Sequence, residues 1–222
     1  MHRLTRTFAT AGAAAALGLI SQPAPAQQLA GEDLIRELQS GGYILVMNTA
    51  PSAIPEPGAQ GQGGRGGFGG GRGGRGGPPG GTPAGDPVPQ LTAEAEAMLV
   101  GTRHAIWHFR IPIGAVLASP VPAATQHAGE VPFVDVAQVA GLGDTSADSG
   151  WLEARLSAVP THGKNEIVVT HAPNIESALG IVDINEGETV IVRPGDNHEV
   201  VGRMSLRQWS VLAIDLEELR NE

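Results

Sequence analysis

The side chains best suited to chemistry in this sequence follow two apolar segments. Asn48 and Thr49 come directly after the run Tyr43–Met47, and His171 comes directly after Glu166–Thr170. A threonine hydroxyl is a weak nucleophile unless a neighbouring base takes its proton, and an imidazole is the commonest base near neutral pH. Thr49 and His171 are therefore a candidate nucleophile and base, provided that the fold brings the two segment ends together.

The segments themselves indicate how that could happen. Tyr43–Met47 has the length of a strand and no polar face, and it lies between Gly41-Gly42 and Pro51. A strand of this kind is buried on both sides, as in a mainly parallel sheet with helices on each face. In such sheets ligands bind outside the carboxyl ends of the strands. Asn48, Thr49 and His171 stand at that edge.

The rest of the chain alternates between strand and helix patterns, which predicts an α/β fold, a three-layer α/β/α sandwich with a mainly parallel sheet. Thr92 is a suitable N-cap, and Ser205 with Gln208 forms a capping box. We expect helices over about 31–39, 92–109, 120–130, 151–159 and 174–179 and from 205 onward, and further strands over 115–119, 189–192 and 199–201. Residues 131–139 are expected to be irregular or an edge strand, and 141–150 a loop.

Bulk composition excludes several classes of function. The chain has 222 residues, enough for one domain with a sizeable core, and a net charge of −9. That charge argues against nonspecific binding to nucleic acid or to an acidic membrane. The absence of cysteine excludes disulfides, thiol catalysis and thiolate metal sites.

The N-terminus has the pattern of an export signal, predicted to comprise residues 1–26. A weakly basic start precedes the apolar segment 8–20, which is too short to span a membrane, and Ala24-Pro25-Ala26 fits a cleavage site. The alternative is an uncleaved N-terminal anchor. We expect an exported protein, periplasmic or extracellular, with no membrane attachment after cleavage.

A low-complexity segment divides the domain. Residues 57–89 are dominated by glycine and proline, so this insertion is expected to be disordered, while 27–56 and 90–222 form one domain. Arg65, Arg72 and Arg75 lie in repeats that resemble RNA-binding Arg-Gly boxes. Three arginines supply little electrostatic attraction, and an exported protein rarely meets RNA, so a nucleic-acid partner is not favoured.

One helix carries a histidine pair. His104 and His108 have the i, i+4 spacing that can hold zinc, but a third ligand and a glutamate partner are not evident. A solvated helix flank is the favoured interpretation. We therefore expect no metal and no cofactor, and the sequence does not identify a partner, a ligand or an oligomeric state.

The order and spacing of several segments resemble the histidine phosphatase superfamily, also called phosphoglycerate-mutase-like. The similar segments are 42–47 (GYILVM), 116–120 (VLASP), 165–175 (NEIVVTHAPNI), 186–194 and 205–212. The resemblance covers roughly residues 31–212 outside the insertion. It implies the sandwich fold expected above and a site for phosphoryl transfer at the carboxyl edge of the sheet.

The resemblance also implies which residues form the site. In the family a histidine after the first strand attacks phosphorus, and two arginines and a second histidine hold the phosphoryl oxygens. The family's Arg-His pair falls on Asn48 and Thr49, and its second arginine falls on Ala123. Only the second histidine is retained, as His171. His127, one helical turn beyond Ala123, is a possible replacement charge, although a surface position is the favoured interpretation.

Two functions remain open. The first is a catalytically inactive pseudophosphatase that serves as a binding or structural module. The second is an enzyme, either a weak phosphomonoester hydrolase with a site rebuilt around His171 or a hydrolase that uses Thr49 and His171. Because the nucleophile and both phosphate-binding arginines are replaced, the inactive protein is the favoured interpretation.

Overall fold

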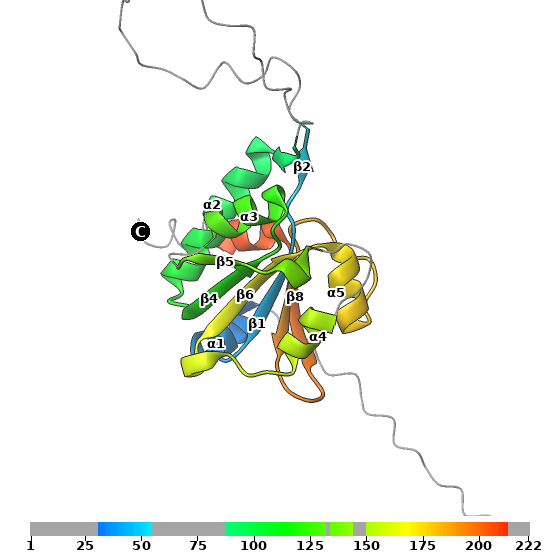
Figure 1. The fold of residues 1–222 in the computed structure, drawn as a ribbon. Helices are drawn as coiled ribbons and strands as arrows, with labels where there is room; N and C mark the ends of the chain where they lie inside the picture. Colours follow the sequence, from blue (N-terminus) through cyan, green and yellow to red (C-terminus); the bar gives the residue numbers. More distant parts are fainter. Residues whose placement is uncertain (1–30, 55–87, 132–133, 144–149, 213–222) are drawn as a thin grey trace, which may run out of the picture.

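The computed structural model describes residues 31–54, 88–131, 134–143 and 150–212 (Figure 1). The predicted signal peptide and nearly all of the predicted insertion lie outside these residues, as do residues 144–149 of the expected loop at 141–150.

A six-stranded sheet in the order β5-β4-β6-β1-β7-β8 forms the centre of the domain. Strands β1, β6, β4 and β5 pair in parallel, whereas β7 runs antiparallel to both of its neighbours, β1 and β8. The mainly parallel sheet expected from the sequence is therefore confirmed. The strands are β1 (Ile44–Asn48), β4 (Ile113–Ala118), β5 (Val136–Gln138), β6 (Asn165–Thr170), β7 (Thr189–Arg193) and β8 (Glu199–Met204).

Helices cover both faces of this sheet, which explains why β1 has no polar side. Leu45 and Met47 point into a core beneath α1 (Gly31–Ser40), α2 (Ala93–His108), α3 (Pro122–Glu130) and the helix at 206–212. Ile44 and Val46 point into a second core beneath α4 (Gly150–Leu156) and α5 (Ala172–Leu179). The molecule is the three-layer α/β/α sandwich that the sequence predicts.

The expected helix ends are largely correct. Thr92 Oγ1 accepts a hydrogen bond from the backbone N–H of Ala95 at 3.2 Å, and Ser205 and Gln208 make the reciprocal bonds of a capping box. Helix α5 begins two residues before the predicted start, because Pro173 is tolerated in a first turn. Helix α4 ends at Leu156, before the predicted 159.

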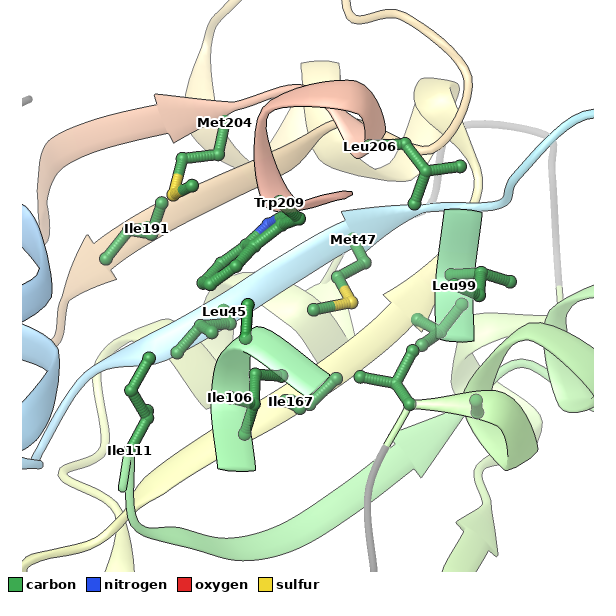
Figure 2. Close-up of a cluster of buried hydrophobic side chains, with 14 of the residues drawn as sticks. Leu45, Met47, Leu99, Ile106, Ile111, Ile167, Ile191, Met204, Leu206 and Trp209 are labelled. Atoms are coloured by element: carbon green, nitrogen blue, oxygen red, sulfur yellow. The ribbon is translucent and has the colours of Figure 1, made fainter. Parts of the chain in front are cut away.

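One tryptophan fixes the final helix on the sheet. Figure 2 shows Trp209 lying over β1, with Leu45 and Met47 on the strand beneath it. Its side chain is fully buried, and its indole Nε1–H donates to Thr189 Oγ1 at 3.0 Å. The helix at 206–212 is thereby held to β7 as well as to β1.

A two-stranded ribbon that the sequence did not predict carries the insertion. Strands β2 (Ser52–Ala53) and β3 (Gln90–Leu91) pair antiparallel, and the ribbon projects from the body of the domain (Figure 1). The Thr92 N–H donates to the Pro51 carbonyl at 3.0 Å and closes its base. The residues that flank the predicted insertion, Ala53 and Gln90, are therefore paired neighbours a few residues after Thr49.

Candidate functional site

The carboxyl ends of β1 and β6 lie side by side. Asn48 is in register with Thr170, so the residues that follow each strand, Thr49 and His171, are neighbours. Thr49 Oγ1 lies 3.4 Å from His171 Nδ1. The two strand ends meet at one edge of the sheet, as the sequence led us to expect.

The direction of the Thr49 hydroxyl does not suit a nucleophile. Its proton is donated to the Thr170 carbonyl at 2.9 Å, and the Thr49 backbone N–H donates to the same oxygen at 2.8 Å. A hydroxyl has one proton, so Thr49 Oγ1 can only accept from the His171 ring. His171 is not placed to remove a proton from Thr49.

Ser119 completes the surroundings of the imidazole. Its Oγ lies 3.0 Å from His171 Nε2 and accepts a bond from the Val121 N–H at 3.3 Å. Since His171 Nδ1–H faces Thr49, Nε2 is the nitrogen that accepts the Ser119 proton. Ser119 is fully buried, so it positions the ring and is not open to a substrate.

Sequence reasoning did not select Ser119 as a site residue. A serine between an apolar strand and a proline is common in turns, and the only signal was its position at the carboxyl end of β4, beside β6. Burial of His171 lowers the pKa of its imidazole. The ring is thus neutral at pH 7 and held between two hydroxyl groups.

Asn48 holds a neighbouring loop and does not face an open pocket. Its backbone N–H donates to the Glu188 carbonyl at 2.8 Å, and its side-chain Nδ2 donates to the Asn185 carbonyl at 2.9 Å. The carboxylate of Glu188 in turn accepts from Asn185 and from Arg203. Burial disfavours the Glu188 anion, but the bonds from Arg203 and Asn185 outweigh it and lower its pKa.

Positive charge is absent from the described part of the site. Ala123 is buried in the first turn of α3, where it supplies no polar group. Arg203 lies at the same edge of the sheet but is paired with Glu188. Within the described ranges, no arginine or lysine hydrogen-bonds to Thr49, Ser119 or His171.

The expectation for His127 was wrong. Its side chain is fully buried, and its Nδ1 accepts a hydrogen bond from the Ala50 N–H at 3.1 Å. Nε2 has no partner among the described residues. Burial lowers the pKa of His127 to about 3, so the ring is neutral near pH 7 and supplies no replacement charge. It is buried because the inward face of α3 consists of Ala123, Ala124, His127 and Ala128.

The other candidate groups lie elsewhere. His104 and His108 are exposed on α2, in agreement with a solvated helix flank. Nowhere in the described part of the chain do three histidine or acidic side chains gather in a way that could hold a metal ion. No helix in the same residues is both long and apolar enough to cross a membrane.

Comparisons with known proteins place this arrangement among known folds. No family model and no curated protein sequence matches the chain. Among solved structures, it is similar to the protein histidine phosphatase SixA complexed with tungstate, with 16% sequence identity and a TM-score of 0.50. That match covers 74% of this chain and 97% of the SixA chain. The chain has the histidine phosphatase fold.

A further match is to the putative phosphohistidine phosphatase SixA from Agrobacterium tumefaciens, at 12% identity and a TM-score of 0.48, covering 74% of this chain and 98% of that one. The four positions that the family resemblance marked as the site are Asn48, Thr49, Ala123 and His171. Thr49 and His171 are in contact, Asn48 binds a loop, and Ala123 lies in the first turn of the helix that follows Ser119.

Proposed function

We propose that this protein is an exported member of the histidine phosphatase fold that does not transfer phosphoryl groups and acts as a binding or structural module. The observation that carries the proposal is the Thr49 hydroxyl bond to the Thr170 carbonyl. Thr49 stands where the resemblance implies the nucleophilic histidine. A side chain that is weakly nucleophilic and already donating to the backbone cannot serve as its replacement.

Electrostatics supports the same conclusion. Phosphoryl transfer depends on positioning and on stabilising the charge of the phosphoryl oxygens. Hydrogen bonds to charged groups contribute about 1.5–3 kcal/mol each, so two missing arginines weaken phosphate binding by several kcal/mol. The neutral His171 does not restore this stabilisation, because burial lowers its pKa.

The alternative, a weak phosphomonoester hydrolase built on His171, has less support. Both ring nitrogens of His171 face hydroxyl groups, Thr49 on one side and Ser119 on the other. An attack on phosphorus by either nitrogen would first break one of these contacts. Nothing in the described edge would then balance the phosphate charge.

Phosphate release from a general aryl phosphate tests the proposal. We expect the purified protein to release no more phosphate than its His171→Ala variant, because neither has a nucleophile or a cationic pocket. The triple variant Asn48→Arg, Thr49→His, Ala123→Arg serves as the comparison, because it restores the histidine and the two arginines that the family resemblance implies. Turnover by the natural protein that His171→Ala abolishes would show that the site is catalytic.

Export has a separate test. The proposed cleavage after Ala26 predicts that the protein from its native host begins at or near Gln27. Mass spectrometry of the N-terminal peptide in each cell fraction measures this. A chain that still begins at Met1 in the cytosolic fraction would refute the proposed location and would renew interest in RNA as a partner of the Arg-Gly repeats.

A further inference from the structure

A groove lies between the start of α1 and the helix at 206–212. Its volume is about 340 Å³, and residues from α1, from the end of β8 and from the helix at 206–212 line it. Gly31, the first described residue, is part of the lining, so the chain that precedes α1 enters the fold at this groove. The proposed function makes no use of it.

The groove has an apolar floor and a polar rim. Leu34 and Met204 are buried and form its floor, and Figure 2 shows Met204 beside the helix at 206–212. Val211 lines its wall and is 42% exposed, while Arg207 and Gln208 lie at the rim. Another apolar side chain placed in this groove would remove apolar surface from water on both sides of the contact, which is favourable.

The chain that enters α1 carries one side chain suited to this groove. Among residues 21–30, which read SQPAPAQQLA, Leu29 is the only large aliphatic or aromatic residue. Leu29 is two residues from Gly31, so their Cα atoms can be at most about 7 Å apart. The covalent chain therefore keeps Leu29 within reach of the groove.

The start of α1 has the spacing of a hydrophobic staple. In this motif the apolar residue before the N-cap packs on the fourth residue of the helix and fixes the angle at which the chain enters. Helix α1 begins at Gly31, so Leu29 and Leu34 occupy these two positions. Gly31 has a left-handed φ of 58°, so the chain bends here and does not extend the axis of α1. Leu34, the residue that the staple pairs with Leu29, lines the groove.

The chain that follows the helix at 206–212 is less suited to the groove. Residues 213–219 read AIDLEEL and contain no glycine or proline that would turn the chain back on itself. Leu216 continues the helical spacing of the buried Leu206 and Trp209, which face the sheet. The sequence thus directs this end of the chain along the sheet face and away from the groove.

We propose that residues 27–30 dock in this groove, with the Leu29 side chain between Leu34 and Val211. The partner of the groove is thus the N-terminal segment of the same chain and not a separate ligand. Docking covers the exposed side of Val211 and leaves the amides of Gln27 and Gln28 in water, where they need no internal partner. The entropic cost is low, because Leu29 is tethered two residues from the groove.

The absence of cysteine from the chain allows a direct test by thiol labelling. In the full-length protein, Leu29→Cys should react with a maleimide at least about tenfold more slowly than Gln28→Cys, because a docked thiol reacts only after local opening. Cysteine is small and apolar, so it still fits the groove. The two rates should become equal in urea.

Two labelling results would contradict the proposal. Equal rates for Leu29→Cys and Gln28→Cys in the native protein would show that the segment does not dock. A slow rate for Leu29→Cys that increases on dilution of the protein would place a second copy of the chain, and not the protein's own segment, over Leu29.

Melting temperatures provide an independent measurement. Leu29→Ala should lower the melting temperature by about 3–6 °C, because most of the docked apolar surface is lost. Leu29→Met should keep the natural value to within about 2 °C, since methionine has a similar volume and adapts to irregular apolar sites. Gln28→Ala is the matched control in the same segment and should have no effect. A Leu29→Ala variant as stable as the natural chain would refute docking.

A double-mutant cycle identifies the surface that Leu29 contacts. Val211→Ala should lower the melting temperature of the natural chain more than that of the Leu29→Ala variant, because the two side chains are in contact. Val182, exposed in the loop after α5, supplies the control, and Val182→Ala should act equally in both backgrounds. Strictly additive effects of Leu29→Ala and Val211→Ala would show that Leu29 packs on a different surface.

Discussion

Lowering the pH below 6.5 should weaken folding steeply, and His127→Asn should remove much of this dependence. His127 is buried, and its pKa falls from 6.5 to about 3 in the folded protein. Below pH 6.5 the unfolded chain therefore binds a proton that the folded chain does not. The stabilising contribution is complete above pH 6.5 and is lost towards pH 3, with a limiting slope of about 1.4 kcal/mol per pH unit.

Urea unfolding at a series of pH values measures this slope. Asparagine does not titrate, and its Oδ1 can accept the Ala50 N–H in place of Nδ1. The smaller side chain should lower stability at pH 7, so the slope and not the absolute value is the readout. The lowered pKa of His171 acts in the same direction, but it is common to both proteins and cancels in the comparison.

His104→Asn supplies the control for this experiment. His104 is exposed on α2, so the variant should keep the full pH dependence of the natural protein. If His127→Asn and His104→Asn gave the same slope as the natural protein, His127 would not be the buried neutral group that the structure describes.

Trp209→Ala should destabilise the domain by about 3–5 kcal/mol, the usual cost of truncating a large buried aromatic side chain. The change opens a cavity over β1 and also leaves the hydroxyl of Thr189 without its indole donor. Thr189 is itself buried, so water does not readily replace the lost bond. The helix at 206–212 should be the first element to detach.

Trp107→Ala is the matched control, because it removes the same side chain from an exposed position. Its effect should lie within about 0.5 kcal/mol, as for most surface substitutions. Chemical denaturation of both variants gives the comparison. Similar losses at the two positions would mean that Trp209 does not join the final helix to the sheet.

The sequence predicted the three layers and the mainly parallel sheet because its strongest patterns are set by burial. The apolar run Tyr43–Met47 can only be a strand with cores on both sides, and Leu45 and Val46 indeed point into different cores. Capping chemistry at Thr92 and Ser205 is local, so it could be read without knowing the fold. The ribbon β2–β3 was missed because two residues per strand carry no periodicity.

The site was predicted only in part, because its chemistry depends on the directions of hydrogen bonds. The positions of Thr49 and His171 at the ends of two predicted strands were enough to predict that they are neighbours. No sequence pattern indicates that the Thr49 hydroxyl donates its proton to the Thr170 carbonyl. His127 was misplaced for a related reason. In a helix of alanines with few large apolar residues, the buried face has a weak signal, and a histidine on it resembles a surface residue.

The ribbon β2–β3 makes the domain suited to circular permutation and to the insertion of a second domain. Paired strands lie about 5 Å apart, so Ala53 and Gln90, which are partners in the ribbon, are close neighbours. The chain can therefore be opened at this point without separating any paired elements of the main sheet. New termini placed here would give a circular permutant, and a whole foreign domain with adjacent ends could be grafted between the same two residues. The ribbon is thus a site at which inserted sequence of any length can be accommodated, a few residues from Thr49.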